Sequence, residues 1–329
     1  MQEDSLSRIA NAFDLHDARL NLISGGQMSY VYESQDDKRP LILRVVKNGG
    51  DRYKLTCAET DFVKYLTDNG INASRPVTSR SGALTELLEV TEGKFIVTAF
   101  ERAPGKPVSL QEWTPSIWEA LGEELGSIHR LAKDYYPATG VRRPHWHEAS
   151  IMDIDRYIPR NHRVLRDKAH ELIASLKKLP MDGECYGLIH SDPNRGNLCA
   201  LNGRITLFDF EDCEYHWFVN DLAVALYFAL EDSFNGQDII SYTGDFMQAL
   251  LRGYSRQNHL DAYWLEQIVI FHKLRDLLTI LYFYADGGNS PGEHEIARAV
   301  RSRMNLELDR PYISVDINTI SGALSEGGQ

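Results

Sequence analysis

A short polar segment near the middle of the chain contains the residue types that phosphoryl transfer uses. The segment from His190 to Asn197 reads H-x-D-x-x-x-x-N, and Asp209 stands twelve positions after Asn197. In such a layout the first aspartate, Asp192, orients the attacking hydroxyl, while the asparagine and the second aspartate hold Mg²⁺ against nucleotide phosphates. The sequence therefore predicts that Asp192 is catalytic and that Asn197 and Asp209 are metal ligands. The alternative for Asp192 is a turn-forming role without chemistry.

The residues between Asn197 and Asp209 predict how these side chains are positioned. Asn202-Gly203 lies between two short apolar stretches, 198–200 and 205–207, which is a strong local signal for a β-hairpin. A hairpin returns the chain to its starting edge, so we expect Asn197 and Asp209 to lie side by side.

The first hundred residues predict strands around one helix, before a break in the pattern. The strands are expected over 17–24, 28–33, 41–46, 84–90 and 94–100, and the helix over 55–69. The segment Ala103–Pro107 contains two prolines and a glycine, which cannot continue a ladder of strands. We therefore expect an N-terminal domain over 1–103 and a C-terminal domain over 104–329.

The C-terminal domain is predicted to be mainly helical around a strand-rich island at 188–210. Helices are expected over 114–132, 151–178, 218–231, 242–254, 262–284 and 293–306. The resulting fold class is α+β.

Composition and charge exclude several classes of protein. The net charge of −12 argues against nucleic-acid binding, which requires a basic surface. The longest apolar run, Leu222–Leu230, is far shorter than the roughly 20 residues of a membrane span. No basic and apolar leader follows Met1, and four scattered cysteines fit reduced thiols, so a cytoplasmic protein is expected.

These motifs resemble the aminoglycoside phosphotransferase and choline kinase-like family, whose members have the two-lobed protein-kinase-like fold. The segment from Ser24 to Tyr32 is similar to the glycine-containing nucleotide loop of that family. The resemblance implies Mg²⁺ as cofactor, ATP or GTP as phosphoryl donor and a hydroxylated small molecule as acceptor. It assigns nucleotide binding to Ser24, Gly25, Gly26, Arg44, Glu59, Glu101 and Ala103, and structural support of the catalytic loop to His190 and Asp221.

Two residues depart from the family pattern. Arg44 stands where relatives usually carry lysine, and its planar guanidinium is not equivalent to an ammonium. Its expected partner is Glu59 on the following helix; the alternatives are an edge-strand arginine facing solvent, or Lys47 in its place. Ser191 stands where relatives often have glycine.

The acceptor is expected to be small because the chain has no peptide-docking segment. Only eleven residues separate Asp209 from Asp221, and no Ala-Pro-Glu occurs there. Acidic residues would then draw an amine-bearing alcohol to Asp192, unless they belong to a solvated face. The candidates are Glu211, Asp212, Glu231, Asp232, His272 and Asp276; Arg275 shares the helix of the last two.

Three readings of function stay open at the sequence level. The first is a small-molecule kinase, within the family most like the homoserine-kinase-like and hydroxylysine-kinase-like branch. The second is a Ser/Thr protein kinase, and the third is a catalytically silent nucleotide-binding regulator. The acceptor, the choice between ATP and GTP, a resistance or a metabolic role and the oligomeric state are left open, and no nucleic-acid or membrane partner is expected.

Overall fold

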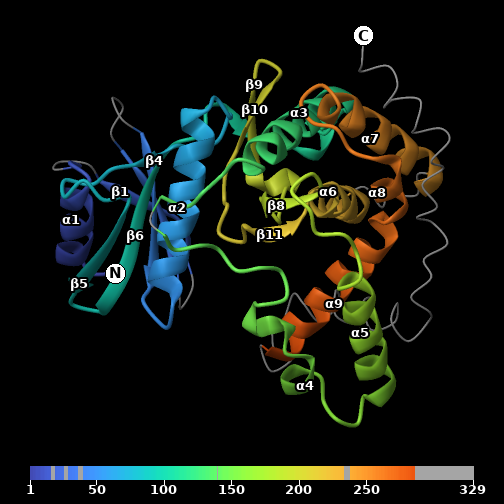
Figure 1. The fold of residues 1–329 in the computed structure, drawn as a ribbon. Coiled ribbons are helices and arrows are strands. Elements are labelled where there is room, and N and C mark those ends of the chain that lie inside the picture. Colours follow the sequence, from blue (N-terminus) through green and yellow to red (C-terminus); the bar gives the residue numbers. More distant parts are fainter. Residues whose placement is uncertain (16–18, 26–28, 36–39, 139, 233–237, 286–329) are drawn as a thin grey trace. The chain divides into compact units, whose positions relative to one another are not determined.

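The computed structural model describes residues 1–15, 19–25, 29–35, 40–138, 140–232 and 238–285 (Figure 1). The chain divides into two compact units. The first unit comprises residues 1–108, 134–143 and 196–213, and the second comprises 109–133, 144–195 and 214–329. The first is built on an antiparallel sheet and the second is mainly helical, which confirms the predicted α+β fold class. The boundary between residues 103 and 104 stays a prediction.

The sheet of the first unit has the order β1-β2-β3-β6-β4, with β5 also paired to β6. All of its pairings are antiparallel. The strands are β1 (Leu20–Gly25), β2 (Ser29–Ser34), β3 (Leu41–Lys47), β4 (Pro76–Val77), β5 (Thr85–Val90) and β6 (Gly93–Glu101). Because β3 lies between β2 and β6, Arg44 is on an interior strand and the edge-strand alternative is wrong.

Alternation along β3 separates its two faces. Leu41, Leu43 and Val45 are fully buried in a core that also contains Ile9 of helix α1 (Glu3–Ala12). Successive side chains of a strand point to opposite faces, so Arg44 points away from this core. Helix α2 (Arg52–Asp68) carries Glu59, the partner of Arg44. The expectation of a single helix in this region was wrong, because the amphipathic α1 buries Ile9 and Ala10 against the sheet.

The predicted hairpin around Asn202-Gly203 is confirmed. Strand β9 (Leu198–Leu201) pairs with β10 (Arg204–Leu207), with Leu198 opposite Leu207. Asn202 and Gly203 have φ values of 52° and 79°, the left-handed conformation that this type of two-residue turn requires. On its other side β9 pairs with β7 (Lys106–Pro107), which lies within the segment Ala103–Pro107. The expectation that this segment cannot join a ladder of strands was therefore wrong for its last two residues, because a proline is tolerated in a short edge strand.

Gly105 is required where β7 approaches β9. A Cβ atom at this position would lie 2.0 Å from the backbone oxygen of Ala200, and φ is 90°. Replacing Gly105 with alanine is expected to lower the free energy of unfolding by about 3 kcal/mol, because backbone must move. Gly203→Ala is the matched control, since φ is also positive but no atom lies within 4 Å; its expected cost is about 1 kcal/mol. Urea denaturation of both variants measures this difference, and equal losses would contradict the steric explanation.

Helices dominate the second unit, around the antiparallel pair β8 (Tyr186–Ile189) and β11 (Glu214–Trp217). Helix α3 packs along α7, and α6 packs against α9 (Figure 1). The helices are α3 (Pro115–Ala132), α4 (Ile154–Tyr157), α5 (Arg163–Leu176), α6 (Phe218–Asp232), α7 (Ile239–Tyr254), α8 (Ala262–Glu266) and α9 (Ile268–Ala285), with short 3₁₀ turns at Leu110–Glu112, Ser150–Met152 and Arg195–Asn197.

Two predicted helices are divided in the structure. The helix expected over 151–178 is interrupted between α4 and α5, because Pro159 lacks an N–H and disfavours helical geometry at Ile158. The helix expected over 262–284 is divided at Gln267 into α8 and α9. The helix expected over 293–306 lies outside the described residues.

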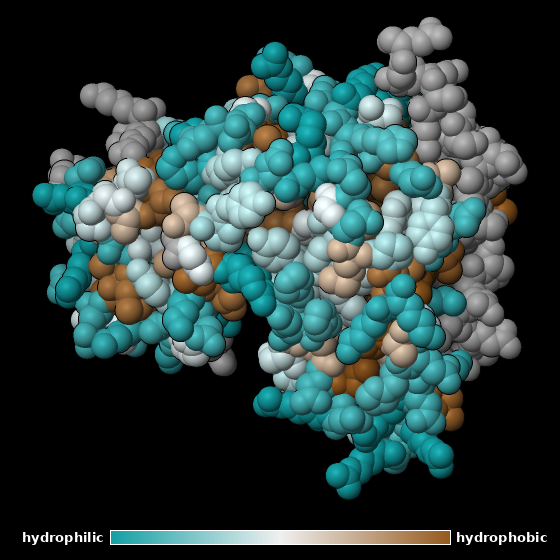
Figure 2. Space-filling model, viewed as in Figure 1, coloured by the Kyte–Doolittle hydropathy of each residue, from teal (hydrophilic) through white to brown (hydrophobic). Residues whose placement is uncertain are grey.

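Both units present a largely hydrophilic surface, with separate hydrophobic patches, in the view of Figure 2. Within the described part of the chain, no helix combines the length and the apolar character needed to cross a membrane. The four cysteines are free thiols, and Cys185, Cys199 and Cys213 are buried.

Candidate active site

A buried carboxylate holds the loop that follows β8. Asp221, at the start of α6, accepts hydrogen bonds from the backbone N–H groups of His190 and Ser191, at 3.0 and 2.8 Å. His129 of α3 also bonds this carboxylate, at 3.0 Å. Asp221, His129 and His190 are fully buried, so the bonds are shielded from water. The loop is therefore fixed immediately before Asp192.

Ser191 has a backbone conformation that favours glycine. Its φ is 71°, in the left-handed region that glycine adopts without steric cost. For serine this conformation costs about 1–2 kcal/mol, and the bond to Asp221 helps to hold it. Such local strain occurs most often where a structure fixes a functional group.

The Asp192 carboxylate has polar partners on both oxygens. Asn194 donates from Nδ2 to Oδ2 at 2.8 Å, and Arg275 of α9 donates from Nη2 to Oδ1 at 3.2 Å. The side chain of Asp192 is 20% exposed, so it remains accessible. Sequence reasoning placed Arg275 on this helix without giving it a role, because no local pattern shows which helix contacts the loop.

The acceptor candidates differ in their surroundings. His272 and Asp276 are buried in the helical packing: His272 bonds the backbone oxygen of Ala223, and Asp276 accepts from Tyr227 at 2.9 Å. These contacts give a role in acceptor binding no support. Asp232 accepts from Arg195 Nε at 2.8 Å, and Glu231 is exposed.

Arg44 is the centre of the charged cluster in the first unit. Its Nη2 lies 2.5 Å from Oε2 of Glu59, and its Nη1 lies 3.6 Å from Oδ1 of Asp209 and 3.6 Å from Oε2 of Glu211. Burial by itself would lower the pKa of Arg44, but these carboxylates raise it above the ordinary value. The guanidinium of Arg44 therefore remains charged, and its bond to Glu59 holds this positive charge in place.

Asn197 and Asp209 occupy the same end of the hairpin. The N–H of Phe208 donates to the backbone oxygen of Asn197 at 3.0 Å, which joins the two strand ends. Asp209 has a φ of 63° and its side chain is 44% exposed. An amide oxygen and a carboxylate are hard donors that suit Mg²⁺, which takes its remaining ligands from phosphates and water. Within the described residues no group of three or more His, Cys, Asp or Glu side chains could hold a metal, so the assignment of Asn197 and Asp209 stays a prediction.

Arg143 is a positioning residue that sequence reasoning missed. It is buried, and its guanidinium donates to the backbone oxygens of Glu211 at 2.6 Å, Cys213 at 2.5 Å and Leu55 at 3.1 Å. Since Leu55 belongs to α2, these bonds tie the segment after Asp209 to the helix that carries Glu59. An arginine outside any motif offered no sequence signal for this role.

Desolvation is the largest cause that raises the pKa of Glu211 from 4.5 to about 7, although its side chain is 57% exposed; Arg44 lowers this pKa, and the neighbouring Asp209 and Asp212 raise it. The folded state thus binds this proton more tightly than the unfolded state, so the contribution of Glu211 to stability is greatest below pH 4.5 and falls as pH rises towards 7. Screening by solvent keeps this contribution small. Glu211→Gln is expected to remove this loss, so its stability relative to wild type should increase between pH 5 and pH 8. Urea denaturation at both pH values measures the change.

The exposed Glu89→Gln variant is the control for Glu211→Gln, because Glu89 pairs only loosely with Lys94, at 3.9 Å. A difference between Glu211→Gln and wild type that is the same at both pH values would contradict the raised pKa. Asp212, the next carboxylate along the chain, is exposed.

The other nucleotide-binding candidates lie at the ends of strands in the same unit. Ser24 and Gly25 end β1, whereas Gly26 lies outside the described residues. At the end of β6, the N–H of Glu101 donates to the backbone oxygen of Arg75 at 2.8 Å. Ala103 is buried, and its N–H has no backbone partner in the described part of the chain. It is therefore the candidate donor towards an adenine edge.

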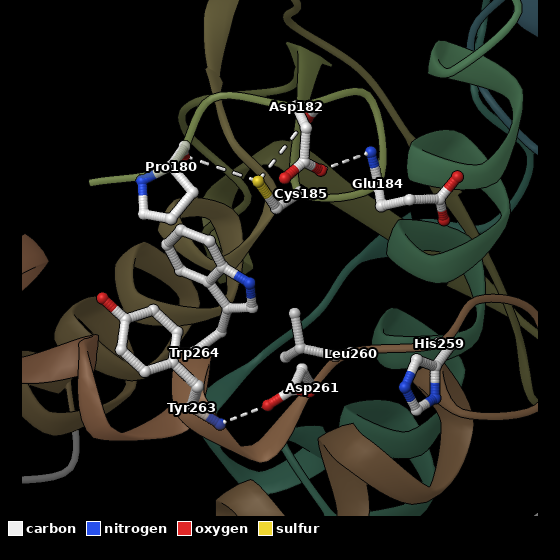
Figure 3. Close-up of a pocket in the computed structure, with 9 residues that line it drawn as sticks. All are labelled: Pro180, Asp182, Glu184, Cys185, His259, Leu260, Asp261, Tyr263 and Trp264. Carbon is white, nitrogen blue, oxygen red and sulfur yellow. Dashed lines mark hydrogen bonds between the residues drawn. The ribbon is translucent and has the colours of Figure 1, made fainter.

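A hollow of about 320 Å³ in the second unit contains none of the predicted site residues (Figure 3). Trp264, Tyr263 and Pro180 line it together with three acidic side chains. Two of these form turns: Asp182 accepts from the N–H of Glu184, and Asp261 from the N–H of Tyr263. We therefore do not assign the hollow to the reaction.

Comparison with known proteins supports the same chemistry. The sequence profile of APH, the phosphotransferase enzyme family, matches residues 19–263. Amicoumacin kinase of Bacillus subtilis (strain 168) is 29% identical over 324 residues, covering 97% of this chain and 96% of that protein. The structure of amicoumacin kinase hAmiN in complex with AMP-PNP, Ca²⁺ and Ami is 28% identical, with a TM-score of 0.83, over 94% of this chain and 95% of that one. A microcompartment-associated aminopropanol kinase, 19% identical, shares the fold with a TM-score of 0.68 over 99% and 96% of the two chains.

Proposed function

Since the chain belongs to the APH phosphotransferase family and is a kinase, we propose that it transfers the γ-phosphate of ATP or GTP to a hydroxyl of a small, amine-bearing molecule. The observation that carries this proposal is the loop after β8, which the buried Asp221 holds so that the accessible Asp192 follows a fixed backbone. A merely structural loop would not require a strained Ser191 beside an accessible carboxylate.

The first unit supplies the nucleotide-binding groups. Arg44, held by Glu59, contributes a fixed positive charge for phosphate oxygens, and its buried Nε has no hydrogen-bond partner among the described residues. Asn197 and Asp209 would hold Mg²⁺, which when bound offsets negative charge on the phosphates. The hAmiN complex contains AMP-PNP and Ca²⁺, which supports binding of a nucleotide together with a divalent cation in this chain as well.

The second unit supplies the group that acts on the acceptor. Asp192 orients the acceptor hydroxyl and takes its proton as the oxygen forms a bond to the γ-phosphorus. The bond from that phosphorus to the bridging oxygen breaks, and a nucleoside diphosphate leaves. The chemistry is an in-line transfer in which positioning and charge stabilisation do most of the work.

The interval between Asp209 and Asp221 supports a small acceptor over a peptide. Residues Glu214–Trp217 form β11, which pairs with β8 from Glu214 opposite Ile189 to Trp217 opposite Tyr186. A backbone that is already paired in this way provides no extended platform for a substrate peptide. The similarity to amicoumacin kinase makes amicoumacin the first acceptor to test. The resemblance to the homoserine- and hydroxylysine-kinase-like branch stays a prediction.

A product screen tests the proposal. The purified chain is incubated with Mg²⁺ and ATP or GTP against amicoumacin, aminoglycosides, amino alcohols and hydroxy amino acids, and phosphorylated products are identified by mass spectrometry. We expect transfer to at least one amine-bearing alcohol. Labelled phosphate on protein alone would instead indicate a protein kinase. Absence of any transfer, with nucleotide hydrolysis unchanged in Asp192→Ala, would indicate a silent regulator.

A further inference from the structure

The contact between α9 and the loop after β8 places a cation directly on the proposed catalytic carboxylate. Arg275 donates from Nη2 to Oδ1 of Asp192 at 3.2 Å, while Asn194 occupies Oδ2. The guanidinium carbon of Arg275 lies 4.8 Å from the ring centre of Phe228, in α6. Stacking on an aromatic ring orients the planar guanidinium and leaves its edge available for hydrogen bonds.

A positive charge here is not explained by proton transfer. An adjacent cation favours the charged form of a carboxylate, which makes Asp192 a weaker base. The bond to Asp192 also uses only one nitrogen of the Arg275 guanidinium. Nε and Nη1 of Arg275 have no hydrogen-bond partner in the described part of the chain, and the side chain is 23% exposed. Arg275 therefore retains donors beside the position at which the acceptor hydroxyl must lie.

Among the described residues, Arg195 is a second cation at this loop, and its charge is also paired. Nε of Arg195 lies 2.8 Å from Oδ2 of Asp232, so its charge is paired within the loop and α6. The neighbours of Arg275 on α9, His272 and Asp276, are bonded inside the helical core. Within the described residues, Arg275 combines unbonded guanidinium N–H groups with a side chain that is 23% exposed, whereas His272 is buried.

We propose that Arg275 binds a carbonyl or carboxylate oxygen of the acceptor. The carbon of that carbonyl or carboxylate group is bonded directly to the carbon that bears the acceptor hydroxyl. The inference rests on the proposed function and narrows its acceptor class from amino alcohols to hydroxy amides and hydroxy acids. A guanidinium suits such oxygens because its planar N–H donors match their in-plane lone pairs. The 3.2 Å between Arg275 and Asp192 lets one acceptor place its hydroxyl on the carboxylate and its neighbouring oxygen on the guanidinium.

Three acceptors with a common amine and hydroxyl test the inference. They are 1-amino-2-propanol, 3-amino-2-hydroxypropanamide and 3-amino-2-hydroxypropanoate, which differ in carrying a methyl, an amide or a carboxylate beside the hydroxyl. Wild type is expected to prefer the amide or the carboxylate, in kcat/KM, by about 10- to 100-fold, the effect of one charge-assisted hydrogen bond. Comparison of the amide with the carboxylate identifies which oxygen is recognised.

Substitution of Arg275 should remove that preference. Arg275→Gln is expected to lower kcat/KM for the preferred acceptor about 10-fold or more relative to kcat/KM for 1-amino-2-propanol. A change common to all three acceptors would report the lost contact with Asp192. Arg275→Lys keeps the charge without the planar fork, so it should retain part of a preference for carboxylate and lose one for amide. Arg163→Gln, at a residue whose side chain is 88% exposed on α5, is the matched control. Thermal unfolding confirms that each variant is folded.

The outcomes separate the two proposals. Equal loss of kcat on all three acceptors in Arg275→Gln would overturn the inference and assign Arg275 to positioning Asp192 alone, with the kinase function intact. A wild type that shows no preference would overturn it as well. Failure of wild type to transfer phosphate to any acceptor of the larger panel would overturn the proposed function and the inference together.

Discussion

Replacing Asp192 with alanine is expected to lower kcat by about a hundredfold or more, with nucleotide affinity near that of wild type. The structure explains why kcat should fall while nucleotide affinity is retained. Asp192 belongs to the second unit and bonds Asn194 and Arg275, whereas the charged cluster at Arg44 is in the first unit. Steady-state kinetics with the acceptor found in the product screen measures kcat, and calorimetry with Mg²⁺ and a non-hydrolysable nucleotide measures affinity.

Asp192→Asn provides a sharper version of the same test. The amide preserves the size of the side chain and removes the charge that orients the hydroxyl and takes its proton, so a loss similar to that of alanine indicates chemistry rather than packing. Asp245→Asn, at an exposed position of α7, is the matched control and should retain wild-type turnover. Turnover of Asp192→Ala at the wild-type rate would show that the assigned role is wrong.

The second large effect is expected at Asp209. Asp209→Ala should abolish Mg²⁺-dependent nucleotide binding, because it removes the carboxylate of the two-residue metal set and also leaves Nη1 of Arg44 with one carboxylate fewer. A carboxylate and an amide are few ligands for Mg²⁺, so the loss of one should not be tolerated. Titration of nucleotide with and without Mg²⁺, in both proteins, gives the Mg²⁺-dependent part of the binding free energy.

The control for Asp209→Ala is Asp51→Asn, an exposed carboxylate in the same unit that forms no capping hydrogen bond to α2. Removing Mg²⁺ from wild type with a chelator should reproduce the Asp209→Ala affinity. If Asp209→Ala binds nucleotide as tightly as wild type and responds equally to Mg²⁺, Asp209 is not a metal ligand.

The kinase assignment came from signals that act over short stretches of chain. The spacing of His190, Asp192, Asn197 and Asp209 is a property of the sequence, and Asn202-Gly203 identified the hairpin because few residue pairs accept two positive φ angles. The apolar run of β3 around Arg44 likewise predicted both a strand and a buried cation with an acidic partner. Such features depend on neighbours in the chain, so they can be recognised without a structure.

Local signals also produced errors where a single residue outweighed a longer pattern. Apolar spacing favoured one helix over 151–178, but the missing N–H of Pro159 separates α4 from α5. Apolar residues near the N-terminus were not recognised as the helix that buries Ile9 against β3.

The sequence by itself determined the chemical class and the β9–β10 hairpin, and it predicted the residues that we propose for phosphoryl transfer. Only the tertiary structure decided which distant side chains surround them: Arg275 at Asp192, His129 at Asp221, and Arg143 at the segment after Asp209. The physical reason is that helix packing, rather than spacing along the chain, sets these contacts, and many helical positions are compatible with one amphipathic pattern. For the same reason His272 and Asp276, which we expected to line the acceptor site, are buried in the helical packing. The residue of α9 that contacts the Asp192 carboxylate is Arg275.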